Sequence, residues 1–306
     1  MISVIWKRIL QLIVVLFIIS SLVFFLQRMI PGNPADMILG PDASDFDKKE
    51  WLIRYGFMDP IFVQYAKFIK NLIYFDFGYS FSSYLKVTDI IFPKFIETMR
   101  LAIFSFLISL LFAVIIGITS SAFHNKGIDK FFAIVSLLFI SAPTFILGPL
   151  FIWLFSVHWD FFPLMGNEGF LSYILPCVTL ALPLSAYTGR MLRSGIVDVL
   201  NEDYIRTARS KGLSFSKILI RHALKNAFLP TLTILGMQLG VLLSGTIITE
   251  QLFNWPGMGS LLIESVNARE YNIVSGCVIL IASVYVICNL FVDLLYSYFD
   301  PRVRYS

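Results

Sequence analysis

Long apolar runs alternate with short polar segments along the whole chain. The apolar runs cover residues 9–30, 98–123, 131–157, 173–192, 229–249 and 273–296. A helix that crosses a lipid bilayer needs about 20 predominantly apolar residues, and each run is close to that length or longer. The pattern therefore predicts an all-α integral membrane protein with six membrane-spanning helices.

The first apolar run follows Lys7 and Arg8, as the core of a signal peptide would. A signal-peptide core has only about 7–15 apolar residues and ends at a small-residue cleavage site. Residues 9–30 exceed that length, and residues 31–34 read Pro-Gly-Asn-Pro in place of a cleavage site. We therefore predict that this run is a retained first span.

Composition also indicates a membrane protein. Hydrophobic residues make up 57% of the 306 residues, charged residues make up 14%, and the mean hydropathy is +0.78. Soluble domains are about 25% charged, so an ordinary soluble domain is excluded. The three cysteines, Cys177, Cys277 and Cys288, lie in or beside apolar runs without metal-type spacing. This placement favours small buried side chains.

The distribution of basic residues predicts the orientation of the chain. If the N-terminus is cytoplasmic, the inner segments hold 14 basic and 5 acidic residues, and the outer segments hold 10 basic and 14 acidic residues. Cytoplasmic loops of membrane proteins are enriched in Lys and Arg. The net charges of +9 inside and −4 outside therefore favour two cytoplasmic termini.

The segment between the first two spans, residues 31–96, has the composition of folded structure. It contains Trp51 and many Phe and Tyr residues, and residues 59–69 have helical spacing. Pro60 suits a helix start, because its missing N–H would have no partner in the first turn. We expect a structured segment that shields the outer ends of the helices.

One polar segment, residues 193–228 between the fourth and fifth runs, is more basic than the others. Eight of the 24 Lys and Arg residues lie between Arg190 and Lys225. A solvated cytoplasmic loop would explain the charge alone. The order of its residues also predicts two short helices that meet at Gly212, with Ser214 as the cap of the second.

The first of these helices is expected to start at Asn201 as its N-cap, with Glu202 and Asp203 near the positive end of the helix dipole. Lys211 places positive charge at its C-terminal end, and Gly212 suits the left-handed residue that closes a helix. One face carries three side chains at helical spacing, Tyr204, Ile205 and Ala208. The second helix carries a basic stripe, Lys217, Arg221 and Lys225.

The loop also resembles a motif of ABC-importer permeases. Arg206-Thr207-Ala208, then Gly212, then His222 and Leu224 follow its EAA pattern: Glu-Ala-Ala, three residues, Gly, nine residues, Ile, one residue, Leu-Pro. The first two positions, the Ile position and the final Pro depart from that pattern. The strings EDYIRTARSKGLS and RHALKNAFLP are more similar to the peptide/nickel branch, which carries its Leu-Pro later, here at Leu229-Pro230.

Three further segments resemble the same family. Residues 54–81 resemble the outer region of the first permease subunit in peptide/nickel importers. Residues 250–271, with a turn at Pro256-Gly257-Met258-Gly259, look like a short re-entrant element near the outer gate. Residues 300–305 are similar to the Asp-Pro-Arg-Ile-Arg-Tyr tail of peptide permeases. The resemblance therefore extends over the whole chain.

This resemblance implies the six-helix fold of a type I ABC importer permease. Its parts would be a first span with a cytoplasmic N-terminus (1–30), an extracytoplasmic segment (31–96), a permease core (97–296) and a cytoplasmic tail (297–306). In the bacterial inner membrane its partners would be lipid, a second related permease, two cytoplasmic ATPases that hold ATP and Mg²⁺, and an extracytoplasmic substrate-binding protein. The chain itself would bind no cofactor, metal or nucleic acid.

The resemblance also implies roles for particular residues. ATPase coupling would fall on Glu202, Asp203, Tyr204, Arg206, Thr207, Ala208, Arg209, Lys211 and Gly212, and the outer gate on Pro256, Gly257 and Gly259. The apolar face of the first loop helix would enter a groove of one ATPase. The second loop helix would carry the motion of that ATPase to the fifth span.

The residues give less support to other classes of function. No Walker, GxSxG or HExxH pattern occurs, which argues against an enzyme. An ion-coupled carrier needs an ionisable residue within the spans, and Asp293 in the sixth run keeps that alternative open. For cargo we favour di- or oligopeptides over nickel, because the spans lack His or acid clusters, although a chelated metal would need none. The substrate-contacting residues stay unassigned.

Overall fold

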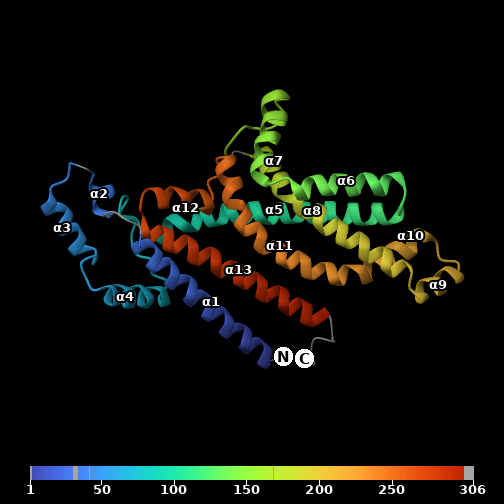
Figure 1. Ribbon diagram of the computed structural model, residues 1–306, viewed down its shortest axis with the longest axis horizontal. Coiled ribbons are helices and arrows are strands. Elements are labelled where there is room, and N and C mark those ends of the chain that lie inside the picture. Colours follow the sequence, from blue (N-terminus) through green and yellow to red (C-terminus); the bar gives the residue numbers. More distant parts are fainter. Residues whose placement is uncertain (1, 30–33, 41, 168, 300–306) are drawn as a thin grey trace. The chain divides into compact units, whose positions relative to one another are not determined.

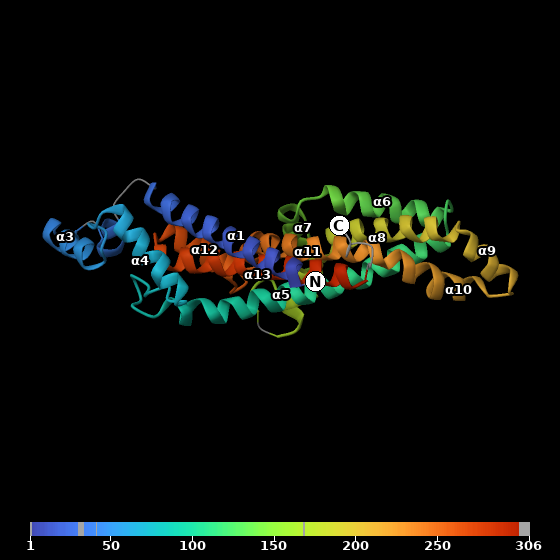
Figure 2. The same ribbon diagram turned by 90° about the horizontal axis from the view of Figure 1, so that it is seen from below.

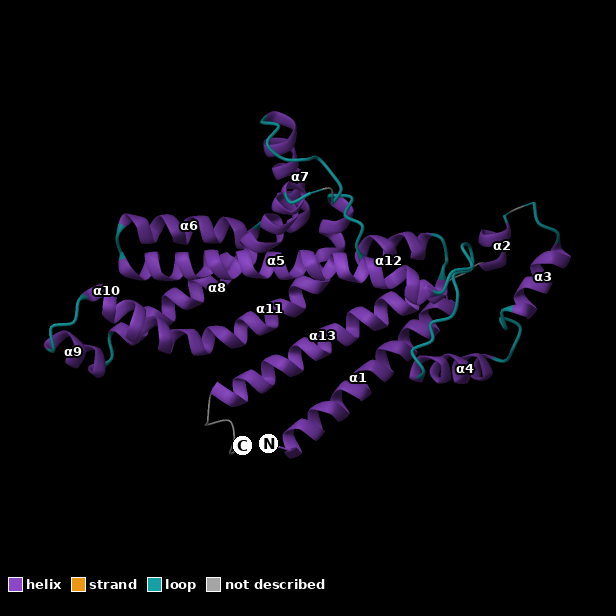
Figure 3. Ribbon diagram, turned by 180° about the vertical axis from the view of Figure 1, so that it is seen from behind, coloured by secondary structure: helices purple, strands orange, loops and turns teal. Residues whose placement is uncertain are grey.

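The computed structural model describes residues 2–29, 34–40, 42–167 and 169–299. These residues form helices joined by loops and turns and contain no strand, which confirms the all-α prediction (Figure 3). Residues 300–306 of the expected tail (297–306) and residues 31–33 of the expected outer segment lie outside the described residues.

Figure 1 shows the helices in chain order. They are α1 (Ile2–Met29), α2 (Pro34–Leu39), α3 (Asp45–Arg54), α4 (Ile61–Ile73), α5 (Val87–Ala122), α6 (Gly127–Ser141), α7 (Thr144–Phe151), α8 (Leu171–Leu200), α9 (Asp203–Ser210), α10 (Phe215–Lys217), α11 (Lys225–Leu252), α12 (Met258–Asn267) and α13 (Tyr271–Phe299). Two π-helical segments continue α7 and α10, namely η1 (Ile152–His158) and η2 (Ile218–Leu224).

Four of the described helices are long and apolar enough to cross a membrane. Their candidate spans are Leu10–Met29, Val87–Ala122, Leu171–Leu200 and Tyr271–Val292. Two bent helix pairs pass the same test when each pair counts as one span, Gly127–Ser141 with Thr144–His158 and Pro230–Leu242 with Thr246–Leu252. The six apolar runs of the sequence thus correspond to four single helices and two bent pairs.

The third apolar run, predicted as one span over residues 131–157, is divided into two helices at Pro143, where a proline permits a kink. The helix axis turns by 105° between the end of α6 at Ser141 and the start of α7 at Thr144. Ala142 has an extended backbone (φ −87°, ψ 116°), because the ring of Pro143 disfavours the helical conformation in the residue before it.

The segment expected to lie outside the membrane is mostly helical. It contains α2, α3, α4 and the first turns of α5, which starts at Val87 and so well before the apolar run at residue 98. Pro60 is the N-cap residue of α4 (φ −53°, ψ 141°), in agreement with the helix start predicted there.

The chain divides into two compact units. The outer-segment unit comprises Met1–Glu97 and Gly257–Val286, and the core unit comprises Thr98–Pro256 and Ile287–Ser306. In the outer-segment unit, one buried cluster joins α5, α12 and α13 through Val87, Ile91, Met258, Leu261, Ile273 and Cys277. A second cluster joins α2 and α3 to the start of α13 through Ala35, Trp51, Phe81 and Tyr271.

The core unit is organised around α8, which packs against α6 and α11 (Figures 1 and 2). Its contact with α5 is especially close at two glycines. A Cβ added at Gly117 of α5 would lie 2.8 Å from Leu192 of α8, and a Cβ added at Gly189 of α8 would lie 2.9 Å from Ile116 of α5. Small residues at both points let the two helix backbones approach, as they do at other helix interfaces in membranes.

Candidate functional site

The basic loop of the core unit begins with the short helix α9, at the far end of α8 (Figure 2). Its N-cap residue is Glu202 (φ −70°, ψ 149°), and the prediction of Asn201 as the N-cap is wrong. Asn201 instead ends α8, where its side-chain amide donates a hydrogen bond to the carbonyl of Val197 (3.1 Å). Asp203 supplies the expected negative charge in the first turn.

Gly212 closes α9 in the left-handed conformation that its position predicts (φ +78°). Its N–H donates to the carbonyl of Arg209 (2.9 Å), and the N–H of Leu213 donates to the carbonyl of Ala208 (3.4 Å). These two bonds form a Schellman closure, which satisfies carbonyls that a helix end leaves free. Leu213 completes the closure by packing against the cluster that contains Ala208.

The apolar face of α9 packs against the chain itself. Ile205 and Ala208 are buried, and both lie in a cluster with Ile218 of η2. Tyr204 is 44% exposed, and its hydroxyl accepts a hydrogen bond from the side-chain amide of Asn226 in α11 (2.8 Å). The expectation that this apolar face would enter a partner's groove is therefore wrong. Its contacts fix α9 to the start of the helix that becomes α11.

The outward side of α9 is polar and basic. Its exposed residues are Asp203, Tyr204, Arg206, Thr207, Arg209 and Ser210, and the C-cap residue Lys211 is exposed as well. Arg206 lies 3.4 Å from the carboxylate of Asp203, but both side chains are largely exposed, so this ion pair adds little stability. A partner that docks on α9 would meet this cationic surface, with Tyr204 beside it.

The second helix of the loop is not a separate short helix, contrary to the prediction. The chain continues without a break from α10 through η2 into α11. Ser214 is the N-cap residue, although its side chain makes no capping hydrogen bond. The basic stripe is exposed as expected, at Lys217, Arg221 and Lys225. The opposite face packs against α8 through Leu219, Ala223 and Ala227.

A buried ion pair at the same end of the core unit was not expected from the sequence. Asp129, at the start of α6, is only 3% exposed. Arg193 of α8 donates to both oxygens of its carboxylate, from Nε and from Nη2 (each 2.6 Å). The hydroxyl of Ser120 and the backbone N–H of Asn125 (2.8 Å) donate to the same carboxylate. This pair joins the α5–α6 turn to the stretch of α8 that leads into α9.

The predicted outer-gate residues surround the junction of α11 and α12. α11 ends at Leu252. Asn254, two residues later, lies in the left-handed region (φ 48°), and the N–H of Trp255 donates to the carbonyl of Glu250 (2.7 Å). Gly257 is the N-cap residue of α12 (φ −98°, ψ −174°), and Pro256 and Gly259 lie on either side of it. The helix expected after the turn is therefore present, while the gate role of Pro256, Gly257 and Gly259 stays a prediction.

A second buried carboxylate, Glu270, ties the outer segment to the α12–α13 turn within the outer-segment unit. It is 3% exposed and accepts hydrogen bonds from the hydroxyl of Ser80 (3.0 Å) and from the backbone N–H groups of Phe81 (2.9 Å) and Ser82 (2.8 Å). Consecutive N–H groups of this kind form a concave anion site. No sequence motif marks such a contact, because its two halves lie far apart along the chain.

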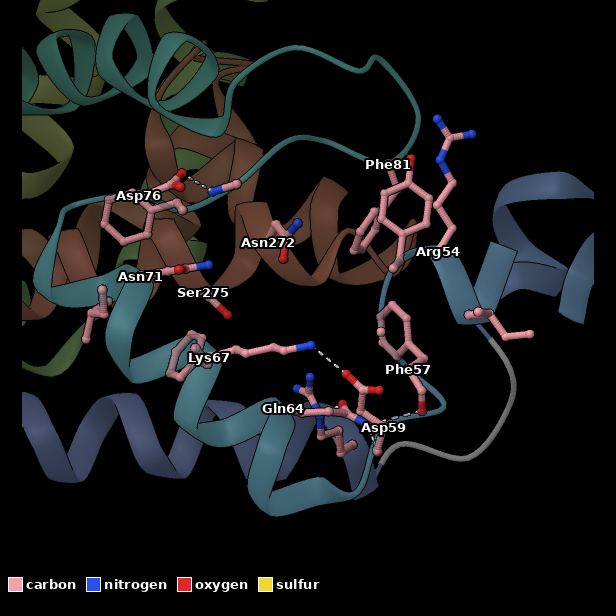
Figure 4. A pocket seen from close by; sticks show the side chains of 18 residues that line it. Arg54, Phe57, Asp59, Gln64, Lys67, Asn71, Asp76, Phe81, Asn272 and Ser275 are labelled. Atoms are coloured by element: carbon pink, nitrogen blue, oxygen red, sulfur yellow. Dashed lines mark hydrogen bonds and ion pairs between the residues drawn. The ribbon is translucent and has the colours of Figure 1, made fainter. Parts of the chain in front are cut away.

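A polar cavity of about 430 Å³ lies between α4 and α13 in the outer-segment unit (Figure 4). The side chain of Gln64 donates to the carbonyls of Phe57 (3.1 Å) and Asp59 (2.8 Å), and Lys67 pairs with the carboxylate of Asp59 (2.7 Å). The polar lining also includes Arg28, Arg54, Asn71, Asp76, Asn272 and Ser275. No motif or spacing in the sequence predicts this cavity.

The described residues include no group of three or more His, Cys, Asp or Glu side chains placed to hold a metal ion. This observation does not decide between a peptide and a nickel cargo, because a chelated metal needs no such group. The expectation that the chain binds no cofactor also stays a prediction. The side chain of Asp293, the residue named for the ion-coupled alternative, lies outside those that the structure describes.

Comparisons with known proteins cover the whole chain. Residues 109–305 match the family described as the binding-protein-dependent transport system inner membrane component, and residues 1–102 match the N-terminal domain of such membrane components. The glutathione transport system permease protein GsiC of Escherichia coli K12 is 38% identical over 306 residues, with full coverage of both chains. Its counterpart in Shigella dysenteriae serotype 1 shows the same identity and coverage.

Solved structures show the same fold at lower identity. An amino acid ABC transporter crystallised with histidines matches with a TM-score of 0.52 and 20% identity, over 70% of this chain and 94% of that chain. An inward-facing MetNI methionine ABC transporter matches with a TM-score of 0.57 and 14% identity, over 68% and 95%. The prediction of a type I importer permease fold is confirmed.

These relatives are inner-membrane transport subunits rather than enzymes. The chain therefore belongs to the inner-membrane components of binding-protein-dependent transport systems, as a permease of the peptide/nickel branch of ABC importers.

Proposed function

We propose that this permease forms the translocation path of an importer for di- and oligopeptides. The observation that carries the proposal is the full-length similarity, at 38% identity, to permeases of glutathione transport. Glutathione is itself a tripeptide, so a cargo of short peptides is chemically similar to the one for which these relatives are named. Nickel and metal chelates are the competing cargo within the same branch.

ABC importers work with ATPase and substrate-binding-protein partners in general. We propose for this system a second related permease subunit, two ATPase subunits and one extracytoplasmic binding protein. ATP and Mg²⁺ would be held by the ATPases, since no phosphate-binding Gly-rich motif occurs in this chain. Both termini would lie in the cytoplasm, on the side where basic residues are concentrated.

The mechanism we propose places α9 between the ATPase and the spans. Closure of the ATPase dimer around ATP would move α9 through its exposed face, which includes Arg206, Arg209 and Lys211. α9 would move as one body with η2, because Ile205 and Ala208 pack against Ile218. η2 continues directly into α11, so the motion would reach the fifth span without a flexible joint.

Two side-chain contacts support this mechanism. The hydrogen bond from Asn226 to Tyr204 (2.8 Å) adds a second connection between α9 and α11. The ion pair of Asp129 with Arg193 holds the end of α8 against the α5–α6 turn. The movement of α9 would therefore be shared between α8 and α11 rather than absorbed by the loop.

The cargo is tested by uptake into proteoliposomes that hold the complete importer, supplied with its binding protein and with ATP inside. Radiolabelled di- and tripeptides are expected to accumulate, and unlabelled peptides of other sequence are expected to compete. Accumulation of Ni²⁺ or a nickel chelate with no uptake of any peptide would replace the peptide proposal, although the chain would remain an importer permease.

A further inference from the structure

Helix α4 of the outer-segment unit has an apolar stripe whose two ends, Phe62 and Ile73, are left exposed by its own unit, while Ile69 between them is half-buried. None of its residues is buried, although the sequence IFVQYAKFIKNLI is rich in large apolar side chains. Phe62 is 79% exposed and Ile73 is 70% exposed. Residues 62, 69 and 73 fall on one stripe, because positions seven and eleven apart in a helix point nearly the same way.

A second stripe of α4 packs against α1 within its membrane-crossing part. The ring of Tyr65 stacks on Phe25 (5.4 Å between centroids), and the ring of Phe68 lies 5.3 Å from Phe24. The hydroxyl groups of Tyr65 and Ser21 lie 2.6 Å apart. The candidate span of α1 ends at Met29, so these contacts lie about 6–12 Å inside that end at 1.5 Å per residue.

The third stripe of α4 is polar; it lies opposite the apolar stripe and next to the stripe that packs against α1. Gln64, Lys67 and Asn71 line the cavity of Figure 4 together with side chains of α13 and of the turn before α4. Arg28 of α1 reaches across to this side and donates to the side chain of Gln64 (2.9 Å). The polar groups of α4 are thus gathered on the protein side of the helix, at the outer end of α1.

We propose that α4 lies in the outer leaflet of the membrane and that lipid acyl chains cover Phe62, Ile69 and Ile73. Lipid is the occupant that the surroundings favour, because the apolar stripe adjoins the exposed apolar surface of a membrane span. Leu22 (54% exposed) and Leu26 (53% exposed) of α1 lie beside the residues that contact α4.

The charge pattern fits the same placement. Lys70 lies between the apolar stripe and the polar stripe, as calculated from 100° per residue. A lysine in that position can keep its stem along the lipid and its ammonium group at the headgroups. An interfacial helix has this arrangement of one apolar face and one basic or polar face. The segment between the first two spans would then be a membrane-bound wall of the cavity rather than a cap in solvent.

Photo-crosslinking of the assembled importer in its native membrane tests this placement. The photoreactive residue p-benzoylphenylalanine is introduced singly at position 62 or 73, at position 71 as the polar-side control, and at position 22 of α1 as the lipid-exposed control. After irradiation, mass spectrometry identifies what has been attached to each position.

Phospholipid adducts are expected at positions 62, 73 and 22, with little or none at position 71. Protein adducts at 62 and 73, from a binding protein, another subunit or a second copy of this chain, would overturn the proposal and identify the true occupant. Phospholipid at position 22 without phospholipid at 62 and 73 would overturn it as well, because the control would show that lipid adducts are detectable. Neither outcome bears on the cargo.

Discussion

The shape of the basic loop depends directly on Gly212. A Cβ added at this position would meet nothing within 4 Å, so packing does not require glycine there. The backbone does, because φ is +78° and both closing hydrogen bonds of α9 form around it. A residue with a branched Cβ disfavours this conformation by about 1–2 kcal/mol.

The substitution Gly212→Val is therefore expected to open the end of α9 without affecting the spans. Membrane accumulation should be normal, while the chain around Lys211 and Lys217 should become more sensitive to protease. Co-purification of the ATPases and ATP-driven uptake should fall. Gly212→Asn is the matched control, since Asn enters the left-handed region more readily and should retain most activity. Equal protease resistance and uptake in both variants would mean that the loop is only a charged connector.

The ion pair of Asp129 and Arg193 is a second contact between single residues that holds the structure, here through charge. Arg193→Gln would leave a carboxylate that is nearly inaccessible to water with two fewer hydrogen bonds, at a cost on the order of 2–3 kcal/mol. The melting temperature of the purified permease should fall. The double variant Asp129→Asn with Arg193→Gln removes the uncompensated charge and should melt above the single variant. If the single variant melts at the wild-type temperature, the pair does not hold α8 to the α5–α6 turn.

At the scale of the element, α9 shows which features of a helix can be predicted from the sequence and which cannot. The helix, its glycine closure and the exposed basic stripe after it were predictable, because each depends on residues within a few positions of one another. The partner of the apolar face was not. The spacing of Ile205 and Ala208 defines a face, but only the fold brings Ile218 against it. The π-helical segment η2 likewise has no signature in the sequence.

Glu270 anchors the segment 78–86 that precedes α5, so its substitution is expected to affect that whole segment. Glu270→Ala would leave two backbone N–H groups and the hydroxyl of Ser80 without their acceptor, which costs about 1–3 kcal/mol. Hydrogen–deuterium exchange should rise in residues 78–86 and not in the core unit. Glu264→Ala, an exposed carboxylate of α12, is the control. Unchanged exchange in Glu270→Ala would show that other contacts hold the segment.

For the whole molecule, the number and order of apolar segments followed from hydropathy, but their bends did not. Pro143 lies at a 105° turn between α6 and α7, whereas Pro176 and Pro183 lie within the single helix α8. Each proline removes one backbone hydrogen bond. Whether the chain turns at a proline depends on which neighbouring groups hydrogen-bond to the backbone carbonyl that has lost its N–H partner. Those neighbours come from other helices and cannot be predicted from the sequence. Buried pairs such as Arg193 with Asp129 were unpredictable for the same reason.

The membrane topology of the whole chain can be tested directly. The excess of basic residues in alternate loops predicts that a reporter fused after Lys130 or after Lys211 is cytoplasmic. A cysteine introduced at Asp45 should react with a membrane-impermeant reagent added outside intact spheroplasts. The exposed position Lys211 provides the opposite case, since a cysteine there should react only after the membrane is ruptured. The reverse pattern would invert the proposed orientation and remove α9 from the reach of a cytoplasmic ATPase.

The most direct test of the central claim is the energy source for transport by the purified protein in proteoliposomes. We predict that peptide uptake requires the complete importer, the binding protein outside and ATP on the ATPase side, and that vanadate stops it. Imposed proton or sodium gradients should give no uptake, and Asp293→Asn should retain substantial ATP-driven activity. Uptake by this chain alone, driven by an ion gradient and lost in Asp293→Asn, would contradict the assignment and favour an ion-coupled carrier.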